Sequence, residues 1–211
     1  LYGGSAVGGV VNVIDNRIPR DAVEGVAGKV DFGLSSGNGG KNGAFMVEGG
    51  SKKYTLHLDA FSRDSSDVSV PVNLPCSKPG APALKRKICN SAATADGGAL
   101  GGSVFFDKGY LGASLSTFKT NYGTVAEDEV TIDMRSKRFA LEGEYKPGGW
   151  AQSVKLQTSR TDYQHTEFEG PDPGTVFKNK GNDLRLELRH AKLGNVEGVV
   201  GLQTEKTHFS A

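Results

Sequence analysis

The stretch Leu184-Arg185-Leu186-Glu187-Leu188-Arg189-His190 decides the fold class of this chain. Leucine occupies every second position through residue 188, and the positions between the leucines are all charged. Successive side chains of a β-strand point to opposite faces of a sheet. The stretch therefore predicts a strand with one apolar face and one charged face.

The same period of two recurs along the chain and predicts nine strands in all. They cover residues 25–35, 44–50, 54–64, 98–106, 110–122, 137–145, 154–163, 184–190 and 196–207. No helical pattern of comparable strength is present, because glycine and β-branched residues recur too often for a long helix. The sequence therefore predicts an all-β, antiparallel fold.

The connections between these strands alternate in length. Short, lysine-containing turns are expected at residues 51–53, 107–109, 146–149 and 192–195. Longer loops are expected at residues 36–42, 65–97, 123–136 and 164–182. Strict alternation of tight turns and long loops is the topology of a transmembrane β-barrel.

A barrel in a membrane turns its apolar faces toward lipid. The side chains expected to face lipid are Leu56, Leu58, Leu111, Leu115, Phe139, Leu141, Leu184, Leu186 and Leu188. Aromatic residues near the strand ends are expected to form two rings at the membrane interfaces. One ring comprises Tyr54, Tyr110, Tyr145 and Trp150 beside the short turns, and the other Phe61, Phe118, Tyr122, Tyr163 and Phe168 near the long loops.

Composition and motifs exclude several classes of function. The net charge of +1, with both signs scattered, leaves no basic footprint for nucleic acid. No apolar run approaches the length of a membrane-spanning helix. The glycine pairs at residues 3–4 and 8–9 lack the Lys-Ser/Thr of a phosphate-binding loop, and no serine lies in a nucleophile elbow with a credible histidine. We therefore expect neither an enzyme nor a cofactor.

The N-terminal stretch LYGGSAVGGVVNVIDNRIP (residues 1–19) is the most specific part of the chain. Its glycines predict a tight turn that leads into a buried strand over residues 10–14. The sequence of this stretch resembles the closing segment of the plug domain in TonB-dependent outer-membrane receptors. Three later parts of the chain also resemble sequence segments of this family: residues 121–123 with 132–135, residues 162–170 and residues 182–190. The zinc-uptake branch of the family shares some of these short motifs.

The resemblance implies a bacterial outer-membrane protein, a 22-stranded barrel closed by a plug. Residues 1–19 would end the plug, and residues 20–211 would form about nine strands of the barrel. The chain has no signal peptide, so it is expected to be an internal fragment that lacks the N-terminal box contacted by the inner-membrane TonB complex. The expected ligand is a scarce nutrient such as a metal ion or a metal chelate of the siderophore type.

Two functions of other classes remain open at this stage. A plug-free, porin-like outer-membrane channel shares the strand rhythm, although it would not begin with residues 1–19. A soluble extracellular β-domain could bind a ligand without a membrane. Detergent dependence of the full-length protein would separate the second alternative from a barrel.

Charged residues on the polar faces of the strands are candidates for a substrate path or for docking of the plug. These candidates are His57, Asp59, Arg138, Glu142, Arg185, Glu187 and Arg189. His165 and Glu167 could together supply two ligands to a metal ion, fewer than the three a stable site needs. A solvated histidine is the simpler interpretation of His165.

The chain has two cysteines, Cys76 and Cys89, in its longest expected loop. An even, close pair in an otherwise cysteine-free chain predicts a disulfide in an oxidising compartment, with two free thiols as the alternative. Closing a ring of this size would stabilise the loop by about 3 kcal/mol in the chain-entropy model. Lys78, Arg86 and their neighbours give the loop a basic tip that suits an anionic ligand.

Overall fold

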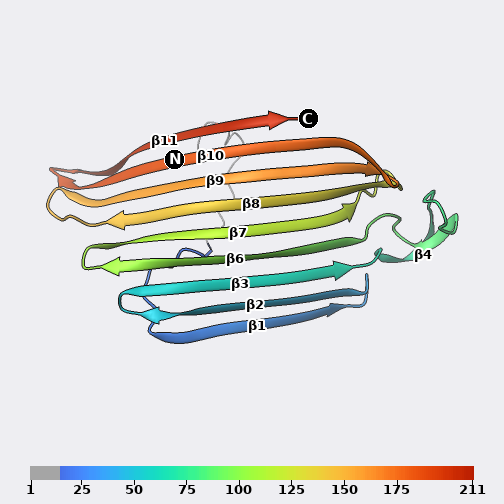
Figure 1. The fold of residues 1–211 in the computed structure, drawn as a ribbon, viewed down its shortest axis with the longest axis horizontal. Helices are drawn as coiled ribbons and strands as arrows, with labels where there is room; N and C mark the ends of the chain where they lie inside the picture. Colours follow the sequence, from blue (N-terminus) through green and yellow to red (C-terminus); the bar gives the residue numbers. More distant parts are fainter. Residues whose placement is uncertain (1–14) are drawn as a thin grey trace.

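In the computed structural model, which describes residues 15–211, nine strands form one antiparallel sheet (Figure 1). Its strands lie in the order β1-β2-β3-β6-β7-β8-β9-β10-β11. Their bounds are Gly25–Ser35 (β1), Gly40–Ser51 (β2), Tyr54–Ser65 (β3), Ala93–Phe106 (β6), Gly109–Gly123 (β7), Val130–Tyr145 (β8), Ala151–Glu169 (β9), Asp172–Leu193 (β10) and Val196–Ser210 (β11). The expected all-β fold and its nine strands are confirmed.

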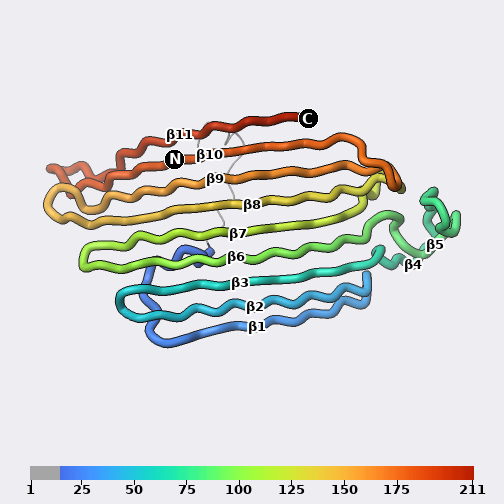
Figure 2. The backbone as a smooth tube through the Cα atoms, viewed as in Figure 1, coloured from blue at the N-terminus to red at the C-terminus, as the bar shows by residue number. Residues whose placement is uncertain are grey.

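The connections lie at two opposite ends of the sheet (Figure 2). The end with the turns after β2, β6, β8 and β10 is called the short-turn end here, and the opposite end is called the loop end. Residues 15–211 contain no helix that is long and apolar enough to cross a membrane. The strand expected over residues 10–14 lies outside the described residues.

The longest loop has more structure than its sequence predicts. Residues 65–97 were expected to lack regular structure, yet they contain β4 (Ser69–Pro75) and β5 (Leu84–Lys87), which pair as a two-stranded sheet. This small sheet projects beyond the loop end of the large one (Figure 1). The sequence does not predict these two strands because they contain proline and lysine, which are both depleted in ordinary strands.

The expectation of a long loop over residues 164–182 is wrong. β9 and β10 continue through this stretch and meet at a tight turn, where Glu169 pairs with Asp172. Gly170 has a φ of 59° and so supplies the left-handed backbone that the turn requires. Backbone hydrogen bonds extend the two strands past the leucine pattern, because the ladder does not depend on apolar side chains.

The sheet has two faces of opposite character, as the alternation predicts. We call the face that carries Leu56, Leu115 and Leu186 the apolar face, and the face that carries His57, Glu142 and Glu187 the polar face. Seven of the nine side chains expected to face lipid are exposed, while Leu141 and Leu188 are half-buried. Among residues 15–211, nothing packs over these leucines to form a second layer.

The two expected aromatic rings are only partly present. Tyr54 and Tyr145 are on the apolar face and about half exposed, at 49% and 47%. Tyr110 is 6% exposed and is on the polar face, as are Phe61 and Phe118, whose rings lie 6.1 Å apart. Their positions along the strands suit an interface, but the period of two turns them to the other side of the sheet.

Candidate functional site: a polar face with a docked segment

The polar face buries polar side chains that an open sheet would leave in solvent. Five of them are at most 8% exposed, and they come from β3, β6, β7 and β8: Thr55, His57, Ser103, Ser114 and Glu142. Residues 15–24, which we call the docked segment, cover this part of the face. Figure 2 shows the segment passing from the level of β6 and β7 across β3 and β2 to the start of β1.

Two glycines let the docked segment approach the sheet closely. A Cβ atom at Gly101 would lie 1.8 Å from the carbonyl oxygen of Arg17. A Cβ atom at Gly112 would lie 2.5 Å from Cγ2 of Ile18. The carbonyl group of Arg17 therefore occupies the space that a side chain at residue 101 would need, and the side chain of Ile18 packs against Gly112. The next residue, Pro19, is fully buried.

Arg17 forms the first of two charged anchors. Its guanidinium contacts both carboxylate oxygens of Asp59, with Nε to Oδ2 at 3.0 Å and the second bond at 3.2 Å. The ring of His57 lies between Asp59 and Glu48, with its two nitrogens 2.9 Å and 2.7 Å from their oxygens. Asn16 donates to the same oxygen of Glu48. The anchor thus joins the docked segment to β2 and β3.

Arg20 forms the second anchor. Its Nε lies 2.7 Å from Oε1 of Glu142, and a second guanidinium nitrogen lies 3.0 Å from Oε2. Gln157 also donates to Glu142 at 2.6 Å, Tyr110 donates through its hydroxyl, and the Lys155 ammonium lies 3.6 Å away. One carboxylate on β8 therefore gathers partners from the docked segment, β7 and β9.

Replacing Glu142 by Gln is expected to destabilise the full-length protein by about 1–3 kcal/mol, because charge-assisted hydrogen bonds to Arg20 and Tyr110 are lost. The side chain of Glu142 is 8% exposed, so water cannot replace these partners fully. Glu144→Gln is the matched control, since Glu144 lies on the same face and its one ion pair among residues 15–211 is a 3.9 Å contact with Lys146. Equilibrium unfolding in detergent should find the control within about 0.5 kcal/mol of the wild type. Equal penalties for both variants would contradict the anchor.

The other candidates for a substrate path lie beside the anchors or at the sheet margin. Asp15, Arg17, Arg20, Arg138, Glu142, Arg185 and Glu187 are among the residues lining a groove of about 940 Å³ on the polar face. Arg185 donates from Nε to Glu187 at 2.9 Å, whereas Arg189 pairs with Glu197 near the short-turn end. Arg138 has no ion-pair partner among residues 15–211.

His165 lies within β9, not in a loop, and its surroundings are largely aromatic. The hydroxyl of Tyr163 forms a 2.9 Å hydrogen bond with Nδ1 of His165, and the centre of the Phe177 ring lies 4.5 Å from the centre of the imidazole ring. Glu167 is 4.0 Å from Nε2. Within the described part of the chain, no third potential ligand joins His165 and Glu167 in a metal-ligand cluster.

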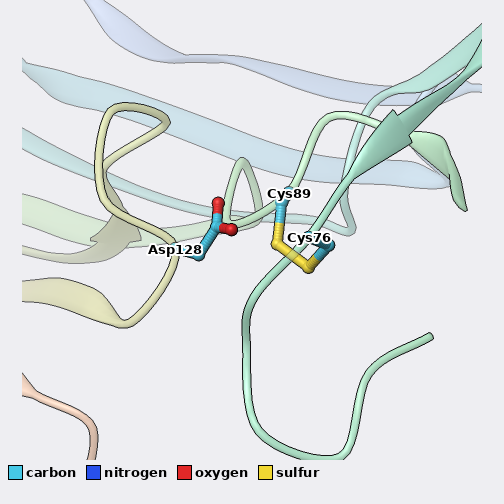
Figure 3. Close-up of side chains that lie close together, drawn as sticks. All are labelled: Cys76, Cys89 and Asp128. Atoms are coloured by element: carbon cyan, nitrogen blue, oxygen red, sulfur yellow. A yellow bond between two sulfur atoms is a disulfide. The ribbon is translucent and has the colours of Figure 1, made fainter. Parts of the chain in front are cut away.

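A disulfide joins Cys76 and Cys89 in the long loop, with their Cα atoms 5.5 Å apart (Figure 3). Both cysteines are 5% exposed, and Asp128 of the β7–β8 loop lies beside them. The amide of Asn90 donates to three carbonyls of that loop, those of Thr124, Glu127 and Val130, at 2.6–3.1 Å. The two loops are therefore held together as one cap at the loop end.

Mass spectrometry of the unreduced, protease-digested full-length protein should detect one species that carries both Cys76 and Cys89. Burial protects the bridge from external thiols, so mild reductant should leave most of it intact. Quantitative alkylation of both thiols without reductant would exclude the bridge.

Asp67 connects two parts of the long loop within the cap. Its carboxylate accepts hydrogen bonds from Lys85 at 2.7 Å and from the backbone amides of Ser91 and Ala92 at 2.9 Å and 3.1 Å. Desolvation raises the pKa of Asp67, but the Lys85 and backbone hydrogen bonds outweigh it and leave the pKa below its ordinary value. The ionised carboxylate therefore stabilises the cap.

The cap is expected to loosen in acid. A lowered folded-state pKa means that the contribution of Asp67 is complete above about pH 4 and is lost as the pH falls through the folded value. Hydrogen exchange corrected for its intrinsic rate should therefore rise in residues 66–92 between pH 5 and pH 3. Asp67→Asn should show the faster exchange at both values. An unchanged pH response in that variant would show that another group controls the cap.

The sequence did not reveal Arg17, Arg20, Tyr110 or Gln157 as site residues. Two signals could have indicated the docked segment. Gly101 and Gly112 fall at polar-face positions of strands, where a missing side chain admits a second backbone. Two arginines follow the glycine-rich stretch within a short distance, opposite candidate carboxylates.

No family model matches the chain. Among solved structures, it is similar to one named the copper transporter OprC, with a TM-score of 0.65 and 12% sequence identity. The match covers 90% of this chain and 29% of that chain, so the chain spans less than a third of the transporter's length. At this identity the likeness shows the fold alone, that of part of an outer-membrane β-barrel.

Proposed function

We propose that the chain is part of a TonB-dependent outer-membrane receptor. Residues 20–211 would form the first nine strands of the barrel, and residues 1–19 would end the plug. The observation that carries this proposal is the docked segment. This segment directly precedes β1 and lies over the polar face of the sheet. Glycines of the sheet leave room for it there, and paired charges hold it in place.

The two faces of the sheet support a place in the membrane. Exposed leucines along the apolar face would be costly in water but suit the hydrocarbon of a bilayer. The polar face would then line the lumen, with residues 15–19 of the docked segment as the part of the plug nearest the wall. This arrangement supports the proposed boundary at residue 19, which lies between the two arginine anchors, Arg17 and Arg20.

The proposed ligand is a metal ion or a small metal chelate. The likeness in fold to a copper transporter supports this class. The basic residues Arg86 and Lys87 in the cap would suit an anionic chelate arriving from outside. Arg138, Arg185 and Glu187 would line its path along the groove, with Arg189 beyond it near the short-turn end, and the inner-membrane TonB complex would supply the energy. Metal binding by His165 and Glu167 belongs to the same proposal.

Uptake by the full-length protein in its host tests the proposal. Deleting the gene should abolish energised accumulation of one radiolabelled metal or metal chelate, and re-expression should restore it. Removing the TonB protein should have the same effect as deleting the receptor. Uptake that continues without TonB would contradict the proposal.

Two further measurements separate the alternatives. A porin-like channel would conduct ions steadily in a planar bilayer, whereas a plugged barrel would conduct little. A soluble ligand-binding domain would stay monomeric after detergent is removed, whereas the exposed leucines of a barrel should cause aggregation.

A further inference from the structure

Above its leucines, the apolar face carries a basic row that the proposed transport does not use. Its members are exposed, lie toward the loop end of β7 to β11, and have outward positions in the strand alternation. They are Lys119, Arg135, Lys137, Arg160, Lys178, Lys180 and Lys206. We call this set the basic row.

The pairing of the strands places the basic row at nearly one level. Asp162 on β9 lies directly opposite Lys137 on β8 and directly opposite Lys180 on β10. Arg160 lies opposite Phe139, one step closer to the leucines. The row therefore begins where the apolar belt ends.

The basic row has more positive charge than its own carboxylates neutralise. Asp133 pairs with Arg135 at 3.1 Å, and Asp162 lies 3.8 Å from Arg160. Asp96, the third acidic residue on this part of the face, makes no ion pair among residues 15–211. The five lysines of the row have no carboxylate within 4.0 Å in the same part of the chain.

A shallow groove of about 540 Å³ connects the leucines to this row. Leu58, Leu100, Leu115 and Phe139 line its apolar part. Lys137, Arg160 and Asp162 lie at its charged end, where the two cations outnumber the carboxylate. Thr117 and Gly98 leave it open, because their side chains are small or absent. The groove thus has the two-part chemistry of a lipid, an acyl chain next to an anionic headgroup.

We propose that this surface binds a phosphorylated lipid of the outer leaflet, with an acyl chain in the groove and a phosphate on Lys137 and Lys180. The inference rests on the proposed function, because it requires that the apolar face contact a bilayer whose outer leaflet meets the loop end. Lysine and arginine near a membrane surface attract anionic headgroups, and the leucines fix the depth at which they do so.

The test uses the full-length receptor in uncharged detergent, with bis-phosphorylated lipid A as the probe. Binding should weaken about tenfold in the double variant Lys137→Gln/Lys180→Gln. The control Lys53→Gln/Lys192→Gln removes the same charge at the short-turn end and should bind like the wild type. Lys137→Arg/Lys180→Arg keeps the charge and should also bind normally, which separates loss of charge from loss of fold.

Two further probes identify what is bound. Lipid A without phosphates should bind the wild type about as weakly as lipid A binds the Gln double variant. Inorganic phosphate at the same concentration should not compete. Equal binding of lipid A by the wild type and the Gln variant, or competition by inorganic phosphate, would overturn the inference. If the protein still requires detergent in that case, the proposed function stands without it.

Discussion

Gly101→Ala is expected to displace the docked segment and destabilise the full-length protein by about 1–3 kcal/mol. The added Cβ would lie 1.8 Å from the carbonyl oxygen of Arg17, so the backbone at Arg17 must move. Movement there would pull the guanidinium away from Asp59, which it contacts at 3.0 Å. One methyl group should thus weaken an anchor that it does not touch.

Gly181→Ala is the matched control for this effect. Gly181 also lies on the polar face of a strand, but among residues 15–211 a Cβ there would come within 4 Å of Thr207 alone, at 3.8 Å. Limited proteolysis within residues 15–24 and thermal unfolding should both distinguish the two variants, with Gly181→Ala close to the wild type. Identical behaviour of the two variants would mean that the segment does not rest on β6.

Leu186→Arg is expected to cost about 2–4 kcal/mol in the full-length protein, because arginine at mid-depth must leave water for hydrocarbon. Leu186 pairs with Leu156 on β9 and with Leu202 on β11, so apolar residues flank it at the same level. Unfolding in lipid vesicles measures the penalty.

Ser159→Arg places the same side chain on the polar face of the neighbouring strand. Ser159 lies directly opposite Asp183, so the new arginine would meet water and a carboxylate. Its effect should be small. A neutral Leu186→Arg together with a severe Ser159→Arg would show that the two faces have been assigned the wrong way round.

The strands could be predicted because their signal is local. Alternation of Leu184, Leu186 and Leu188 with charged residues depends only on the geometry of a strand. The extension of β9 and β10 could not be predicted in this way, because polar residues such as Gln164 and Asn182 pair through their backbone alone. The face of the sheet on which an aromatic side chain lies was harder to predict, as the burial of Tyr110 on the polar face shows.

The site required information that no single strand contains. Asp59 and Glu142 were candidates as charged residues on polar faces, but nothing local indicated that each would receive an arginine from residues 17–20. Such contacts join positions that are 42 and 122 residues apart in the sequence. The shape that allows them depends on two glycines, whose role is visible only once a second backbone is in place.

Spin labels placed singly at residues 184–190 of the full-length protein, reconstituted into lipid vesicles, test most directly whether the sheet lies in a membrane with the polar face inward. Labels at residues 184, 186 and 188 should be relaxed by oxygen, which concentrates in lipid. Labels at residues 185, 187 and 189 should respond instead to a water-soluble nickel complex. A signal without this period of two, or with the two sets exchanged, would contradict the account.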